Sequence, residues 1–209
     1  MLQFVLILLA TAGAQVFGGI LSWFLVKNFC RNLRTAVLAE IIIMFLISTM
    51  LIGEGLRITL LSVVSVFIGI IAIGVLNKTI PHRHETRAEK LGFMVFIAMC
   101  FHEFPEGVAF GAAYLVNPAF GVLTGIMIAL HNLPEGSIVS LPYFMKKKFV
   151  RGLGAVMVTQ LLYIIGGIAA YSLMLNVPVE LQAVSMTFAA GAMLYLITEE
   201  FLWVRCMND

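Results

Sequence analysis

The chain has 209 residues, of which 61% are hydrophobic and only 11% are charged, and its formal net charge is +2. A soluble domain would carry charges on roughly a quarter of its residues, so this composition excludes an ordinary soluble globular protein. Mean hydropathy is +1.04, and no basic, aromatic-rich segment points to nucleic acid as a partner. The sequence therefore predicts a protein embedded in a lipid bilayer.

Apolar runs of about 18 residues or more are long enough to cross a bilayer as helices. We expect them to form one all-α, polytopic transmembrane bundle over residues 1–209, because the connections between them are short. The first run is interpreted as a retained helix and not as a signal peptide, since it lacks a basic start and a small-residue cleavage site. The seven expected spans are 2–26, 36–53, 58–77, 91–115, 119–144, 151–174 and 182–204.

Lysine and arginine residues gather on one side of the expected bundle. All of them except Arg57 and Arg205 fall in or beside the first, third and fifth connections. Basic residues favour cytoplasmic loops, so the N-terminus is predicted outside and the polar loop 77–90 in the cytoplasm. His82 and His84 in that loop are candidates for binding metal at a cytoplasmic exit, with merely solvated side chains as the alternative.

Two nearly identical hexapeptides, HEFPEG and HNLPEG, lie near the middle of the fourth and fifth spans. In each, a histidine precedes a glutamate by four residues, so the two side chains lie on one face of a helix. The pairs are His102 with Glu106 and His131 with Glu135. Adjacent antiparallel helices would bring both pairs together at the bilayer midplane.

Each hexapeptide also contains a proline, Pro105 or Pro134, which we expect to break the regular helix. Proline removes one backbone hydrogen bond and pushes on the carbonyl four residues earlier. Those carbonyls belong to Phe101 and Leu130. Each helix therefore offers an imidazole, a carboxylate and a loosened carbonyl at one level, which is a set suited to holding a cation.

Glu103, Glu106 and Glu135 place carboxylates at a depth where one charged side chain costs roughly 2.5–3.5 kcal/mol. No lysine or arginine lies at that depth to pair with them, so protonation, water or a bound cation must compensate. Imidazole together with carboxylate favours a divalent transition ion, with Zn²⁺ first and Fe²⁺, Mn²⁺, Co²⁺ or Cd²⁺ after it. A calcium or magnesium site would use oxygen ligands alone.

The segments HEFPEGVAFG and HNLPEGSIVSLP resemble the fourth and fifth transmembrane helices of the ZIP family of zinc and iron transporters. FIGIIAIGVLNKTIPHRHE is similar to the third helix of that family and its histidine-bearing loop, and FAAGAMLYLITEEF is similar to its seventh helix. LIGEGL more faintly resembles the end of the second helix. The resemblance implies a bundle of three, two and three helices with a metal site between helices four and five.

Carried over by position, the resemblance implies that both histidines and both glutamates of the His–Glu pairs line one metal position. It implies a second, adjacent position at Glu103 and Asn132, with Glu106 and Glu135 bridging the two. At the metal entrance, it matches Glu200 to a glutamate of the family.

The chain departs from the family pattern in three ways. The family usually has asparagine in place of Glu103, and its sixth helix commonly supplies a glutamate where this chain has Tyr163, with Gln160 one turn earlier. We hypothesise that Glu103 restores the carboxylate that is lost from helix six. The family also has eight spans, whereas seven are expected here.

The leading prediction is a divalent-metal transporter, not an enzyme, that moves zinc-like ions toward the cytosol. Glu200 and Glu54, both predicted near the outer face, are candidates for metal entry, with solvated helix ends as the alternative. An intramembrane zinc hydrolase and a non-transporting metal sensor remain open as other functions. The sequence also leaves the oligomeric state open, a homodimer included.

Overall fold

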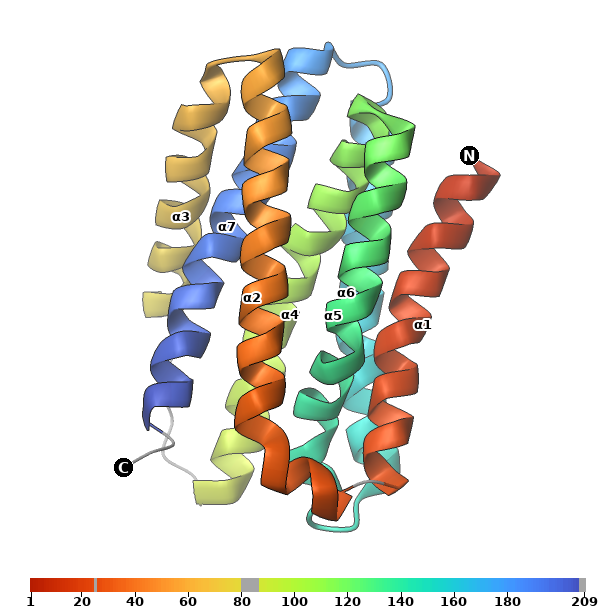
Figure 1. Ribbon diagram of the computed structural model, residues 1–209, viewed down its shortest axis with the longest axis vertical. Coiled ribbons are helices and arrows are strands. Elements are labelled where there is room, and N and C mark those ends of the chain that lie inside the picture. The colour runs from red at the N-terminus through yellow and green to blue at the C-terminus, as the bar shows by residue number, and fades with distance from the viewer. Residues whose placement is uncertain (25, 80–86, 207–209) are drawn as a thin grey trace.

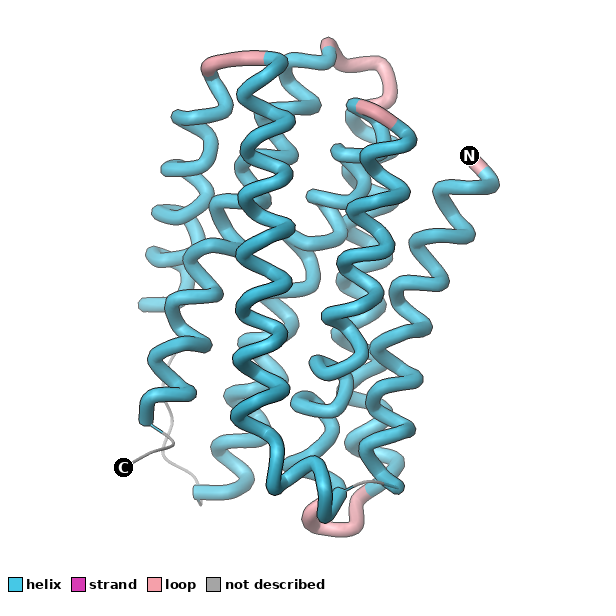
Figure 2. Tube along the Cα trace, in the orientation of Figure 1, coloured by secondary structure: helices cyan, strands magenta, loops and turns pink. Residues whose placement is uncertain are grey.

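The computed structural model describes residues 1–24, 26–79 and 87–206, which form helices joined by short loops, with no strand among these residues (Figure 2). The predicted all-α bundle is therefore confirmed. The helices are α1 (Leu2–Phe24), α2 (Val26–Ile58), α3 (Leu61–Thr79), α4 (Arg87–Val116), α5 (Pro118–Phe144), α6 (Phe149–Met174) and α7 (Val179–Cys206).

Several helices extend beyond the apolar runs that predicted them. The helix α2 begins at Val26 and α4 at Arg87, whereas spans were expected from residues 36 and 91. Hydropathy marks only the apolar part of a helix, and a helix can continue into polar residues at the membrane surface. Five segments are long and apolar enough to cross a membrane: Leu2–Phe24, Leu38–Ile58, Pro118–Phe144, Phe149–Met174 and Val179–Thr198.

The helices run along the long axis of the molecule, and consecutive helices alternate in direction (Figure 1). The helices α4 and α5 pack against each other, α1 packs on α5, and α6 packs on α4. The helices α2, α3 and α7 form a second group, in which α7 contacts both α2 and α3. The two groups meet where α7 contacts α4 and α2 contacts α5.

A tight turn makes α4 and α5 antiparallel neighbours. Asn117, the one residue between the two helices, accepts hydrogen bonds on its side chain from the backbone N–H groups of Ala119 (3.0 Å) and Phe120 (3.3 Å). Pro118 begins the next helix, where its missing N–H has no cost. The polypeptide thus reverses direction at once, and the HEFPEG segment of α4 comes to lie beside the HNLPEG segment of α5.

The contact between α1 and α5 is repeated between α6 and α4. A side-chain carbon added at Gly136 of α5 would collide with the backbone oxygen of Gln15 on α1. A side-chain carbon added at Gly107 of α4 would collide with the backbone oxygen of Tyr163 on α6. These glycines are the last residues of the two motifs. Because they have no side chain, α5 packs directly against the backbone of α1, and α4 packs directly against the backbone of α6, as small residues allow in membrane bundles. We call α1 and α6 the outer helices.

The same repeat is visible from the outer helices. Gly18 of α1 faces the backbone oxygen of Leu133, and Gly166 of α6 faces the backbone oxygen of Phe104. The two outer segments read QVFGG and YIIGG. The described helices thus contain an internal two-fold relationship, in which α1 corresponds to α6 and α4 corresponds to α5.

Candidate metal centre

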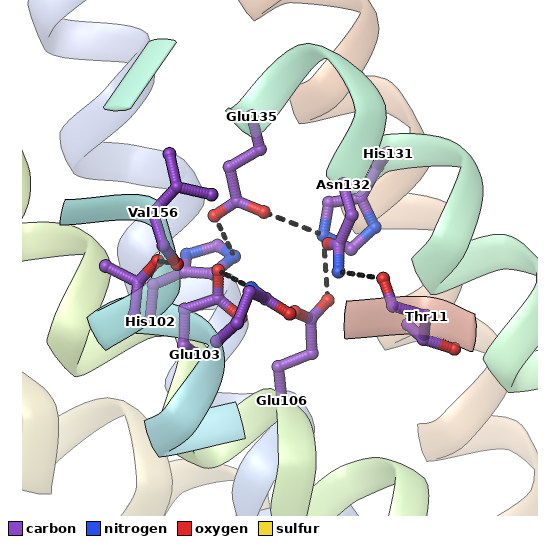
Figure 3. A network of polar contacts seen from close by, with 10 residues as sticks. Thr11, His102, Glu103, Glu106, His131, Asn132, Glu135 and Val156 are labelled. Carbon is purple, nitrogen blue, oxygen red and sulfur yellow. Dashed lines mark hydrogen bonds and ion pairs between the residues drawn. The ribbon is translucent and has the colours of Figure 1, made fainter. Parts of the chain in front are cut away.

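Two residues from each motif helix meet in the middle of the bundle. His102 and Glu106 of α4 and His131 and Glu135 of α5 each offer a ligand atom, and these four atoms lie within 4.8 Å of one another. All four side chains are at most 1% exposed. Figure 3 shows that they point toward a common centre from the two helices. The structure therefore brings together the two His–Glu pairs that the sequence predicts.

The closest approach within this cluster joins the two helices. Nε2 of His131 lies 2.7 Å from Oε1 of Glu106. Glu135 lies between the two imidazoles, with Oε1 at 3.7 Å from Nε2 of His102 and Oε2 at 3.8 Å from Nε2 of His131. Each glutamate therefore faces an imidazole from the opposite helix.

The prolines do not break the helices, contrary to our expectation. Helix α4 continues through Pro105, and α5 continues through both Pro134 and Pro142. A fixed φ near −65° is compatible with a helix, and neighbouring helices in a membrane bundle can accommodate the backbone groups that a proline leaves without a partner. The regular helical spacing is therefore kept on both sides of each proline, which holds histidine and glutamate on one face.

Asn132 follows His131 and also faces the cluster (Figure 3). In one orientation, its Nδ2 donates to the backbone oxygen of Thr11 over 3.4 Å. In the opposite orientation, Nδ2 donates to Oε2 of Glu135 (3.1 Å) and to Nε2 of His131 (3.2 Å). The amide can therefore turn either its N–H donors or its oxygen toward the cluster, and the oxygen could bind a cation.

Glu103 does not join the four-residue cluster. It is fully buried, and its Oε1 accepts a hydrogen bond of 2.7 Å from Nε2 of Gln160 on α6. The side chains at Glu103 and Asn132, expected to share a second metal position, thus come from different helices with different partners. The carboxylate of Glu103 is directed toward α6, the helix that lacks the glutamate of the family pattern.

Reasoning from the sequence missed Gln15 and considered Tyr163 only as the residue at the place of the family's helix-six glutamate. Gln15 of α1 lies beside the Glu103 carboxylate, and Tyr163 of α6 lies near Glu106 and Thr11. Gln15 and Tyr163 are both 0% exposed. The segments QVFGG and YIIGG carried a signal for them, because each residue precedes a Gly-Gly pair by the same spacing. A glutamine within an apolar span was a second signal.

The donor set of the cluster fits a divalent transition ion. Two imidazoles and two carboxylates are the nitrogen and oxygen ligands that zinc binds at about 2.0–2.2 Å in tetrahedral sites. Two carboxylates also match the charge of a divalent ion, so that loading would leave the cluster close to neutral. Oxygen-only sites of the kind preferred by Ca²⁺ and Mg²⁺ contain no imidazole.

The other candidate metal residues lie elsewhere. Glu54 pairs with Arg57, with Oε2 and Nη1 3.1 Å apart, at the end of α2. Glu200 lies within the last part of α7. His82 and His84 lie outside the described residues. Among these residues, only the side chain of Glu54 is described, and it is not part of the four-residue cluster.

Comparison with known proteins supports the assignment suggested by the motifs. No family model matches the chain. The chain is 32% identical over 162 residues to the zinc transporter ZupT of Chlorobaculum parvum, an alignment that includes 68% of this chain and 60% of that protein. The chain therefore spans less than two thirds of the length of this relative. This identity, on a helical bundle whose two related motifs meet at a buried His–Glu cluster, supports the ZIP family as the family of this chain.

Proposed function

We propose that this protein carries divalent transition-metal ions, zinc foremost, across a membrane toward the cytosol. The observation that carries the proposal is the buried meeting of His102, Glu106, His131 and Glu135 between α4 and α5. Similarity to a zinc transporter adds independent support. Zinc is the transported substrate in this proposal, with Fe²⁺, Mn²⁺, Co²⁺ and Cd²⁺ as further candidates that the same donors can bind.

Electrostatics explains why the cluster needs a cation. Glu106 and Glu135 are 0% exposed, and a charged side chain at the centre of a membrane helix costs several kcal/mol. A divalent ion between these carboxylates would offset that cost. Because the ligands must lose their protons to bind metal, acid pH should weaken zinc binding and slow zinc uptake.

Transport requires the buried site to open to one side of the membrane and then to the other. The four candidate ligands come from two antiparallel helices, α4 and α5. Each of these helices extends from the site toward both sides of the membrane. The inward direction follows from the expected orientation, in which the basic connections face the cytosol.

An intramembrane zinc hydrolase is the weaker alternative. A catalytic zinc usually has three protein ligands and keeps a fourth position open for water. Here four protein donors surround the centre, and Asn132 adds an amide beside them. A non-transporting metal sensor would use the same closed site, so flux must separate a sensor from a transporter.

The test is zinc flux into proteoliposomes that contain the purified chain and a trapped zinc indicator. We expect uptake by the parent chain, and its loss in His102→Ala and Glu135→Gln. Glu180→Gln is the matched control, because Glu180 is an exposed carboxylate in the first turn of α7. Zinc binding without flux in the parent would instead indicate a sensor, and equal flux in all variants would contradict the site.

A further inference from the structure

The turn between α5 and α6 is strongly basic and lies at one end of the bundle, beside the end of α1 (Figure 1). Residues 145–151 read MKKKFVR, with four basic residues and no acidic one. We call these four residues the basic turn: Lys146, Lys147, Lys148 and Arg151. Both flanking helices are long and apolar enough to cross a membrane, so the basic turn lies where the bilayer meets water.

Backbone hydrogen bonds fix the conformation of this turn. The N–H of Lys147 donates to the backbone oxygen of Phe144 over 2.9 Å, and the N–H of Lys148 donates to that of Tyr143 over 3.0 Å. Lys147 has a φ of 58°, and among the residues that the structure describes it is the one non-glycine residue with positive φ. Glycine usually occupies this left-handed position after a helix, because a side chain makes it unfavourable. Folding alone would therefore favour glycine where the chain has a charged lysine.

Three aromatic rings support the turn from inside the bundle. The ring centroid of Trp23 on α1 lies 5.1 Å from those of both Phe144 and Phe149, and the two phenylalanine rings stack at 5.6 Å. A side-chain carbon added at Gly152 would come within 2.5 Å of the Phe144 ring, so α6 begins in close contact with the end of α5. Tryptophan is enriched at the level of lipid headgroups. The turn is thus held rigidly at that level.

The exposed side chains of this segment combine charge with apolar surface. Lys146, Lys147 and Arg151 are exposed, and their neighbours Met145 and Val150 are 65% and 81% exposed. Basic side chains at a membrane surface attract anionic headgroups, while apolar neighbours can enter the boundary with the acyl chains. A nucleic acid or an acidic protein would match the charges but leave both apolar side chains in water. The combination therefore favours a lipid with an anionic headgroup.

We propose that the basic turn binds the headgroup of an anionic phospholipid, with phosphatidylglycerol as the probe. Each basic residue close to an anionic membrane surface contributes roughly a fivefold gain in affinity. The bound lipid would lie at the end of α5, the helix that carries His131 and Glu135. The inference goes beyond metal transport and does not depend on it, because it rests on different residues.

The experiment measures quenching of Trp23 fluorescence by brominated lipids. Trp203→Phe leaves Trp23 as the one tryptophan of the full chain, which is reconstituted in phosphatidylcholine vesicles. Brominated phosphatidylglycerol or brominated phosphatidylcholine then replaces part of the bilayer in steps, at fixed ionic strength. The bromine content at half-maximal quenching gives the relative affinity of the two lipids next to Trp23. We expect a preference for phosphatidylglycerol of about tenfold or more, as two or more basic residues should give.

Lys147→Gly is the decisive variant, because glycine suits the left-handed conformation and removes only the charged side chain. The lipid preference should fall roughly fivefold, while the thermal stability of the protein stays the same or rises. Adding Arg151→Gln should bring the preference close to one. Arg57→Gln is the matched control, because Arg57 is an exposed basic residue at the opposite end of the bundle, where it pairs with Glu54. This variant should keep the full preference.

Equal quenching by the two brominated lipids in the parent would contradict the proposal. So would a preference that persists when Lys147→Gly and Arg151→Gln are combined, or one that Arg57→Gln lowers to the same extent. Excess glycerol phosphate, at matched ionic strength, separates a lipid headgroup from a free phosphate. We expect the preference to remain in its presence, whereas its loss would show that the turn binds soluble phosphate and not lipid.

Discussion

Nε2 of His131 on α5 lies 2.7 Å from Oε1 of Glu106 on α4, a short contact that joins the two motif helices. Both side chains are 0% exposed. The pair is also half of the candidate metal centre, so its loss should affect stability and metal binding in different ways.

Glu106→Gln should lower zinc affinity by about 100-fold, or about 2.7 kcal/mol, because an amide replaces one of two charged ligands. Without metal, the same change removes a buried charge and should leave thermal stability equal to or above that of the parent. Thermal unfolding of the purified protein with and without zinc measures both effects. The parent should gain about 2.7 kcal/mol when zinc is at 100 times its Kd.

Glu180→Gln again serves as the control and should keep the full stabilisation by zinc. A Glu106→Gln protein that is stabilised by zinc as strongly as the parent would show that Glu106 is no ligand.

The imidazole of His102 should set the preference of the site for zinc over harder ions. His102→Glu replaces a nitrogen ligand by a carboxylate, and carboxylate-rich sites suit Mn²⁺, Mg²⁺ and Ca²⁺. We expect the ratio of zinc to manganese affinity to fall by about tenfold, or about 1.4 kcal/mol. Competition between the two ions for the purified protein measures this ratio, and an unchanged ratio would argue against ligation by His102.

The glycines at the ends of the motifs should be far less tolerant of alanine than helical glycines with open space beside them. Gly107→Ala and Gly136→Ala would each press a methyl group against a backbone carbonyl, and overpacking of this kind costs about 1–3 kcal/mol. Gly13 and Gly154 are also within helices but have no atom within 4 Å of an added side-chain carbon. Their change to alanine should be neutral or stabilising by up to about 1 kcal/mol.

Thermal unfolding of these four variants provides the comparison. Equal destabilisation in both pairs would mean that loss of glycine itself is harmful and that the close approach is not the cause.

A pair of serines joins α1 to α5. The hydroxyl oxygens of Ser22 and Ser140 are 3.0 Å apart, and both side chains are buried. Hydrogen bonds between membrane helices contribute about 0.6 kcal/mol on average. A double-mutant cycle with Ser22→Ala and Ser140→Ala should therefore give a coupling of about that size. Strictly additive losses would indicate that each hydroxyl acts only on its own helix.

Much of the metal centre was predictable because helical spacing is regular. A separation of four residues placed His102 with Glu106 and His131 with Glu135 on single faces, and the short connection at Asn117 made the two helices neighbours. The same regularity explains why the prolines misled the prediction. A local rule describes an isolated helix, whereas the packed bundle keeps the helix continuous through Pro105 and Pro134.

The environment of Glu103 was less accessible to sequence reasoning. Its partner Gln160 is 57 residues away, and Gln15 lies on the first helix. The sequence suggested Glu103 as a substitute for a helix-six carboxylate, but the direction of its side chain depends on how α6 packs against α4. Such contacts follow from tertiary structure, and only the matched QVFGG and YIIGG segments gave a clue to them.

The paired glycine contacts also determine which boundaries within the bundle can separate. At Gly107 and Gly136, backbone touches backbone, so there is no layer of side chains that could change rotamer as the helices move. Separating α4 from α6, or α5 from α1, would expose carbonyl groups to an apolar surrounding. The less costly movement keeps these four helices together and shifts them against α2, α3 and α7. Two residues without side chains thus favour a movement in which α1, α4, α5 and α6 stay together.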